Sequence, residues 1–155
     1  MATLRVGVIA DTHGLLRPAA VACLRGSDHI LHAGDIGAPG IVPALEALAP
    51  VTAIRGNIDR DAWARAFPET RTVTLGGIDV HLVHDVKDLD PDFPVGRIGV
   101  VVSGHSHRAG IDRRGGTLFL NPGSAGPRRF RLAVTVAHLT LDGDRAEARI
   151  EALDV

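Results

Sequence analysis

Three short apolar runs in the first part of this chain each stop at a residue type that can bind a metal. They end at Asp11, Asp35 and Asn57, and His13 follows Asp11 by two residues. Short apolar runs bounded by glycine are typical of buried parallel strands, and open α/β sheets bind ligands at the carboxyl ends of such strands. The chain is therefore predicted to be an α/β protein with a polar site at one sheet edge.

Helices are predicted between these strands, over residues 18–25 and 39–48. Pro18 suits a first helical turn, and Gly26 suits the residue after the last one. A helix starting near Asp61 is also expected. The pattern then changes to strand alternation over residues 72–75 and 78–84, which flank two glycines and predict a hairpin at an antiparallel sheet edge.

The last part of the chain is predicted to be mostly strand. Residues 98–103 form an apolar run that ends at Gly104-His105-Ser106-His107. Residues 117–121 follow as another strand, and residues 129–141 and 145–153 are predicted to close the chain as a hairpin around Asp142-Gly143. Residues 85–96 are expected to form a loop at the rim of a cleft.

Composition narrows the classes of function. The length of 155 residues and the hydrophobic content of 45% predict one domain over residues 1–155. The net charge of −1 predicts no electrostatic field strong enough to hold nucleic acid. Aromatic residues make up 3%, so base-stacking platforms are not expected. No membrane partner and a cytoplasmic location are predicted, because neither a secretory signal nor an apolar run of ~18 residues is present. Cys23 is the single cysteine and is expected to be a buried helix residue.

The side chains that follow the predicted strands are nitrogen and oxygen donors, with no thiolate among them. They are Asp11, His13, Asp35, Asn57, His84, His105 and His107. Such donors suit Mn²⁺, Fe, Ni²⁺, Co²⁺ or Zn²⁺ at open catalytic positions better than a structural zinc site. Seven donors are too many for one transition-metal ion that must keep a coordination position open. They suit two ions that share a bridging carboxylate.

The order of these motifs resembles that of the calcineurin-like metallophosphoesterase superfamily. The matching motifs are Asp11-x-His13, Gly34-Asp35, Gly56-Asn57, His84 and Gly104-His105-x-His107. Residues 9–14, 32–35 and 121–124 are similar to its small bacterial and archaeal branch of YfcE-type phosphodiesterases. The resemblance implies a four-layer αββα sandwich of two mixed β-sheets flanked by helices.

The resemblance also implies a role for each donor. Asp11, His13 and His107 would hold the first metal, Asn57, His84 and His105 the second, and Asp35 would bridge them. The implied activity is hydrolysis of a small phosphoester, with a hydroxide between two divalent ions attacking phosphorus in line. Manganese is the first expectation for the ions. Asp35, Asn57 and His105 are the predicted catalytic residues.

Three positions depart from the family pattern. Many relatives have a histidine after the asparagine and an aspartate three residues after the bridging one, a pair associated with protonation of the leaving oxygen. Here these positions are Ile58 and Ala38, which predicts a preference for diesters or activated leaving groups. Asp85 replaces the usual glycine after His84, either as an orienter of a ligand or as a residue tolerated in left-handed backbone.

Other polar residues are given structural roles or left open. His32 is either a core histidine or a partner of a ligand, and Asp59 either orients a ligand or caps a helix. The Asn121-Pro122-Gly123-Ser124 turn is expected to brace the His105 loop. Structural or surface roles are expected for His29, His81 and His138, and strand alternation would leave at least two of Arg128, Arg129 and Arg131 in solvent.

Two alternatives to a phosphodiesterase stay open, as does assembly into a homo-oligomer. One is a scaffold that keeps this fold as a protein-binding module, as a eukaryotic retromer subunit of similar shape does. The other is a nuclease of the same superfamily. The complete donor set argues against the scaffold, and the lack of a basic stripe argues against the nuclease.

Overall fold

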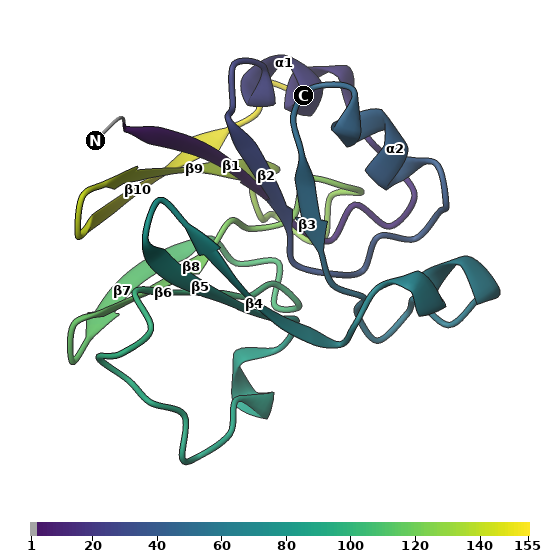
Figure 1. Ribbon diagram of the computed structural model, residues 1–155. Coiled ribbons are helices and arrows are strands. Elements are labelled where there is room, and N and C mark those ends of the chain that lie inside the picture. The colour runs from purple at the N-terminus through teal and green to yellow at the C-terminus, as the bar shows by residue number, and fades with distance from the viewer. Residues whose placement is uncertain (1–2) are drawn as a thin grey trace.

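Two mixed five-stranded sheets pack face to face in the computed structural model, which describes residues 3–155 (Figure 1). The first sheet has the order β10-β9-β1-β2-β3, and the second has the order β4-β5-β6-β8-β7. The strands of the first sheet are β1 (Leu4–Ile9), β2 (His29–His32), β3 (Val51–Ala53), β9 (Thr135–Asp142) and β10 (Arg145–Ala152). Those of the second are β4 (Thr70–Leu75), β5 (Ile78–Val83), β6 (Val100–Val102), β7 (Gly110–Arg114) and β8 (Thr117–Asn121).

Each sheet combines three parallel strands with two antiparallel ones. In the first sheet β1, β2 and β3 run parallel, with β3 at one edge, while β9 pairs antiparallel with β1 and β10 pairs antiparallel with β9. In the second sheet β5, β6 and β8 run parallel, and β4 and β7 pair antiparallel at the two edges. The carboxyl ends of neighbouring parallel strands meet at one sheet edge, so the residues that follow them are brought together.

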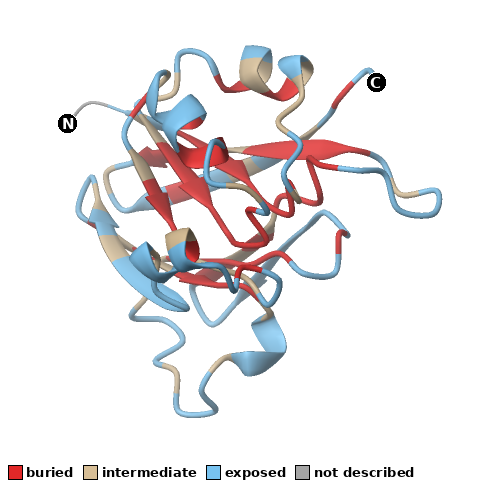
Figure 2. Ribbon diagram, turned by 90° about the vertical axis from the view of Figure 1, so that its right-hand side faces the viewer, coloured by how far each residue is buried: buried red, intermediate tan, exposed pale blue. Residues whose placement is uncertain are grey.

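The main hydrophobic core lies between the sheets. Val6 and Val8 of β1 point into it from one side, and Val80 and Leu82 of β5 from the other. Figure 2 shows this buried interior between exposed loops. Burial of each such side chain stabilises the fold by about 1.5–3 kcal/mol, which makes this core the main link between the sheets.

Two short helices, α1 (Pro18–Leu24) and α2 (Ile41–Glu46), lie outside the first sheet. Pro18 occupies the first turn of α1 as predicted, and Leu24 and Leu45 bury against the outer face of the sheet. Two 3₁₀ helices follow, η1 (Ala62–Ala66) and η2 (Val86–Asp88). The outer face of the second sheet meets the segment after η2, where the rings of His81 and Phe93 are 5.0 Å apart. Its outer layer is therefore mainly loop where helix was expected.

The predicted α/β class, the two mixed sheets and both hairpins are confirmed, but several bounds differ. The strand expected over residues 98–103 contains only Val100–Val102. Strand β7 was not predicted, because all five of its residues are exposed and lack apolar alternation. Residues 129–134 are not strand, since the Leu132 amide donates to the Arg129 carbonyl in a turn. Within residues 3–155, no helix is both long and apolar enough to span a bilayer.

Candidate metal centre

All seven donors predicted from the sequence follow the carboxyl ends of parallel strands. Asp11 and His13 follow β1, Asp35 follows β2, Asn57 follows β3, His84 follows β5, and His105 and His107 follow β6. The structure brings six of them into two clusters of potential ligands. We call Asp11, His13 and His107 the inner ligand group, and Asp35, His84 and His105 the outer ligand group. Each group combines residues from both sheets.

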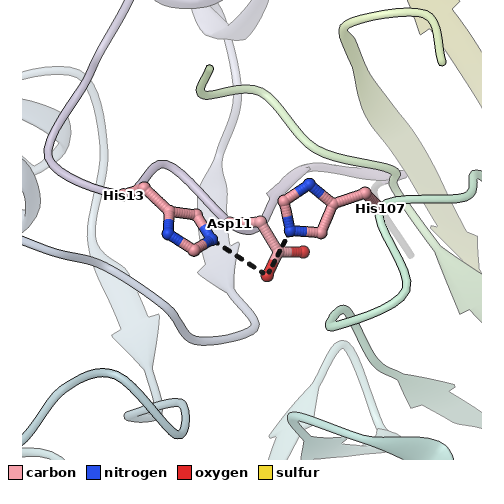
Figure 3. A group of neighbouring side chains, drawn as sticks. All are labelled: Asp11, His13 and His107. Atoms are coloured by element: carbon pink, nitrogen blue, oxygen red, sulfur yellow. Dashed lines mark ion pairs between the residues drawn. The ribbon is translucent and has the colours of Figure 1, made fainter. Parts of the chain in front are cut away.

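The inner ligand group surrounds one carboxylate oxygen (Figure 3). Asp11 Oδ1 lies 3.9 Å from His13 Nε2 and 3.7 Å from His107 Nε2. Donor atoms that share an ion at about 2.1 Å lie roughly 3–3.5 Å apart, so small shifts suffice to bind one ion here. Asp11 Oδ2 accepts a hydrogen bond from the His105 amide at 3.1 Å, which fixes the carboxylate against the β6 loop.

The outer ligand group is more exposed to solvent. Its Asp35 and His84 side chains are almost completely buried, whereas the His105 side chain is 45% exposed. Asn57, the seventh predicted ligand, lies beside them, with Oδ1 3.2 Å from His105 Nδ1. These four side chains offer carboxylate, imidazole and amide donors, which suit a first-row divalent ion.

Asp35, a member of the outer ligand group, also lies close to the inner ligand group. Its Oδ2 atom is 3.5 Å from His13 Nε2 and 3.2 Å from His84 Nε2. Its Oδ1 atom accepts a hydrogen bond from the Ile58 amide at 3.2 Å. Gly56 packs so closely on this carboxylate that a Cβ atom there would overlap it. Asp35 thus lies within reach of both groups, as the predicted bridging role requires.

Unsatisfied polar atoms support a metal at this place. Within residues 3–155, four buried side-chain atoms lack a hydrogen-bond partner: Asp11 Oδ1, His13 Nε2, His84 Nε2 and His107 Nδ1. All four belong to predicted ligands. A buried polar atom without a partner costs about 1–3 kcal/mol, and a coordinated cation would remove most of that cost. The residues present therefore fit a divalent metal centre.

Backbone strain concentrates on the same residues. Six non-glycine residues in the described chain have positive φ, and five of them are predicted ligands: Asp11, His13, Asp35, His105 and His107, with φ between 47° and 72°. Left-handed backbone is uncommon outside glycine, and such strain tends to collect at functional sites. The sharp turns after the strands direct the ligand side chains into one centre.

Burial and neighbouring charges set the protonation of this centre in the absence of a metal. Burial raises the pKa of Asp11 to about 7, although His84 opposes the shift. Burial, followed by the charge of Arg129, lowers the pKa of His107 to about 4. Burial disfavours the His84 cation, but the Asp35 carboxylate, the Ala33 carbonyl and the charge of Asp11 together outweigh burial and raise the His84 pKa. Near neutral pH, an incoming ion would displace a proton from Asp11.

Asp59 holds the loops of the outer ligand group together. Its buried carboxylate accepts hydrogen bonds from the amides of Ile36, Gly37 and Gly56, at 2.8–2.9 Å. The sequence left open whether Asp59 orients a ligand or caps a helix. Asp61, not Asp59, stands at the start of η1, so the helix-capping alternative is wrong. The three amides flank Asp35 and Asn57, so Asp59 supports ligands from two strands.

The structure also shows where the three residues that depart from the family pattern lie, namely Ala38, Ile58 and Asp85. The Ile58 side chain is largely exposed, and neither it nor Ala38 can donate a proton. Asp85 has φ −113°, so its interpretation as a residue in left-handed backbone is wrong. Its carboxylate accepts a hydrogen bond from the Lys87 amide and lies 3.6 Å from His105 Nε2. Asp85 is thus placed to orient an exposed ligand.

The remaining histidines lie outside both groups. His32 is fully buried, with Nε2 3.0 Å from Thr12 Oγ1 and Nδ1 accepting from the Gly34 amide, as expected for a core histidine. His138 has a partner acid that its sequence spacing did not indicate, because β10 places Glu151 Oε1 2.6 Å from its Nε2. Neither ring reaches a ligand cluster.

Two further features border the centre. Asn121 donates from Nδ2 to the Gly104 carbonyl at 3.0 Å, so the predicted bracing turn does contact the His105 loop. A cavity of about 410 Å³ opens beside the outer ligand group. Its lining includes Arg55, Asn57, Glu69, His84, Asp85, Asp88 and His105. The outer ligand group is therefore open to small molecules from the solvent.

Comparison with known proteins agrees with this geometry. Residues 4–144 match the family described as "Calcineurin-like phosphoesterase superfamily domain". The chain is 34% identical over 158 residues to a "Probable metallophosphoesterase" of Methanothermobacter thermautotrophicus, covering 94% of this chain and 90% of that protein. The family match covers the positions of all seven donors.

Solved structures show the same fold. A structure titled as that of a novel archaeal phosphodiesterase matches with a TM-score of 0.79 and 22% identity, covering 97% of this chain and all of that one. Zinc-complexed Vps29 from Entamoeba histolytica matches with a TM-score of 0.75 and 22% identity, covering 97% of this chain and 98% of that one. At this level of identity, both matches describe the fold alone.

Proposed function

Because this chain belongs to the calcineurin-like phosphoesterase superfamily, we propose that it is a dinuclear metal-dependent phosphodiesterase. The observation that carries the proposal is the position of Asp35 Oδ2, between His13 of the inner ligand group and His84 of the outer one. Two bound ions would neutralise charge on the phosphate and lower the pKa of an attacking water.

The protein residues hold and orient the reacting groups. His84 Nδ1 donates to the Ala33 carbonyl at 2.7 Å, which leaves Nε2 free as a ligand atom. Asp35 would bridge the two ligand groups. Asn57 and His105 line the cavity, so their polar atoms are placed to contact the phosphate of a bound ester as well. We therefore assign catalytic roles to Asp35, Asn57 and His105.

The substrate class follows from what the site lacks. Ile58 and Ala38 occupy the positions where many relatives carry proton donors, so the leaving oxygen receives no proton from them. Loss of a general acid costs on the order of 10²–10⁴ in rate for poor leaving groups. We expect hydrolysis of aryl phosphodiesters and weak activity on sugar monophosphates. Comparable rates on the two classes would contradict this expectation.

The test is metal analysis of the purified protein, followed by hydrolysis of bis-p-nitrophenyl phosphate before and after chelation. Activity should disappear on chelation and return with Mn²⁺, Ni²⁺ or Co²⁺, among which we expect Mn²⁺ to be most effective. Asp35→Ala should abolish turnover while unfolding stays cooperative. Asp144→Ala, a matched change in an exposed turn, should leave turnover unchanged. A full-rate Asp35→Ala protein would refute the dinuclear proposal.

The scaffold alternative makes the opposite prediction. Vps29 shares the fold, so the fold by itself does not separate an enzyme from a binding module. Here every predicted ligand position carries a competent donor, which favours catalysis. We propose a small phosphoester as the substrate and residues 1–155 as one working domain in the cytoplasm. Metal binding without hydrolysis of any phosphoester would favour the scaffold.

A further inference from the structure

A second cavity, of about 530 Å³, lies on the outer face of the first sheet. Its lining comes from the end of α1, the loop that leads into β2, and strands β1, β9 and β10. The metal ligands follow the carboxyl ends of the parallel strands, whereas this cavity borders the amino end of β1. None of its lining residues belongs to either ligand group. Its volume is in the range of small-molecule binding sites.

Strand pairing explains why two arginines of this sheet face the cavity. Arg5 of β1 and Arg149 of β10 lie in strands on either side of β9. Arg5 precedes Val6, and Arg149 pairs with His138, which precedes Leu139. Val6 and Leu139 point into the core between the sheets, so their neighbours point to the outer face. The two arginines therefore reach the cavity from strands about 10 Å apart, twice the spacing of neighbouring strands.

Positive charge exceeds negative charge in this lining. Arg5, Arg25 and Arg149 contribute three guanidinium groups, and Glu151 contributes the one carboxylate among the lining residues. With histidine counted as neutral, the lining has a surplus of two positive charges, although the whole chain has a net charge of −1. In residues 3–155, the side chains of Arg5 and Arg25 form no ion pair. We call this site the arginine cavity.

The carboxylate in the lining already has other partners. Glu151 accepts a hydrogen bond from the Cys23 thiol at 3.2 Å, and its Oε1 atom lies 2.6 Å from His138 Nε2. Arg149 Nη1 is farther away, at 3.5 Å from the same oxygen. Cys23, which the sequence predicted to be buried, is partly exposed here. The guanidinium groups therefore stay available to a ligand that brings its own negative charge.

We propose that the arginine cavity binds a small molecule through a phosphate monoester group. Guanidinium groups bind phosphate oxygens in pairs, with charge-assisted hydrogen bonds. A phosphate monoester concentrates two negative charges on one tetrahedral group, which matches the surplus charge of the lining, whereas a carboxylate carries one. Among the described residues that line the cavity, none is Phe, Tyr or Trp, so stacking of a nucleobase is not part of this site.

Cys23 allows binding to be measured in the cavity itself, because it is the single cysteine of the chain and belongs to the lining. Iodoacetamide is added to the metal-loaded protein, and intact mass gives the rate of Cys23 alkylation. Glycerol 3-phosphate should slow alkylation in a saturable way, whereas glycerol at the same concentration should not. Succinate at the same ionic strength should protect less, since its two charges lie on separate groups. Equal protection by succinate would contradict the choice of phosphate.

Arginine variants test the contacts. Arg5→Gln and Arg149→Gln should each weaken binding of glycerol 3-phosphate about tenfold, since each removes a charge-assisted hydrogen bond. Arg145→Gln is the matched control, because Arg145 lies on the same strand and face as Arg149 but outside the cavity lining. It should leave binding unchanged. Equal weakening in this variant would show a general effect of net charge and contradict the site. All three side chains are exposed, so we expect the variants to fold.

Calorimetry on Asp35→Ala separates the arginine cavity from the metal centre, where a phosphate could also bind. This variant should still bind glycerol 3-phosphate, and adding Arg149→Gln should weaken that binding about tenfold. A binding heat that Arg149→Gln leaves unchanged would refute the proposal, as would the absence of both binding heat and protection of Cys23. Binding in the cavity of a protein that hydrolyses no phosphodiester would refute the proposed function alone.

Discussion

The inner and outer ligand groups are built from the same residue types but meet the solvent differently. Asp11 and His107 of the inner group are buried, and the protein backbone fixes the Asp11 carboxylate. His105 of the outer group is largely exposed, and a cavity opens beside it. We therefore expect the inner group to retain a bound ion, and the outer group to exchange its ion more readily and to be the side from which a substrate approaches.

The two groups also differ in what supports them. The inner group depends on the turns that directly follow β1 and β6. The outer group takes His84 and His105 from the segments after β5 and β6, and Asp35 from the loop after β2, which Asp59 ties to the loop after β3. Damage to the outer group should therefore be partial and repairable by excess metal, while damage to the inner group should not. The following predictions test this contrast.

The largest effect should come from the inner carboxylate. Asp11→Asn removes the charge of a fully buried ligand, and we expect loss of the inner ion and a fall in diester turnover on the order of 10³. His105→Ala should keep the inner ion and recover part of its activity when metal is added in excess. Metal stoichiometry and kcat measure both. Equal losses of turnover in the two variants, with no recovery in excess metal, would contradict the expected difference between the inner and outer ligand groups.

A smaller but broader effect is expected from Asp59. In Asp59→Asn, the amides of Ile36, Gly37 and Gly56 lose a charged acceptor, so the free energy of unfolding should fall by about 2–4 kcal/mol. Urea unfolding measures this fall, and titration with Mn²⁺ should show weaker binding at the outer group alone. Asp61→Asn, an exposed neighbour, should stay within about 0.5 kcal/mol of the native protein. Similar losses in the free energy of unfolding of both variants would contradict the supporting role assigned to Asp59.

The pH dependence of metal binding should separate the groups by the protons that they release. The raised pKa of Asp11, about 7, means that below this pH its carboxyl must lose a proton before it binds an ion. Affinity at the inner group should fall about tenfold per pH unit below pH 7. His107, with a pKa of about 4, adds nothing to this slope above pH 5. Calorimetry in two buffers at pH 6 should detect about one proton from Asp11, and its absence would contradict this protonation state.

The smallest effect is expected on the outer face of the first sheet, far from both groups. Glu151 accepts from His138 and from the Cys23 thiol there. Glu151→Gln replaces a partly exposed carboxylate with a neutral amide. It should therefore change the free energy of unfolding by about 1 kcal/mol or less and leave diester hydrolysis unchanged. Thermal unfolding and a kinetic assay check this. Altered turnover would show that the two regions are coupled.

The sequence predicted which polar side chains lie together better than it predicted the residues that support them. Apolar runs that end in Asp, Asn or His mark the strand ends, and the topology then brings those ends together. The role of Asp59 was not decided, because its three partners are backbone amides, which leave no side-chain pattern. Strand β7 was missed because exposed edge strands lack a hydrophobic period. The turn over residues 129–134 was missed because alternation predicted a strand there.

The mixed origin of each ligand group has a consequence for the folded chain as a whole. His107 reaches the inner group from one sheet while Asp11 comes from the other, and Asp35 and His84 meet across the same boundary. An ion bound to either ligand group would therefore link the two sheets of the sandwich. Bound metal would then protect the protein from heat and proteolysis in proportion to the logarithm of its free concentration. Metal shortage would then lower the amount of folded protein as well as the activity that we propose for it.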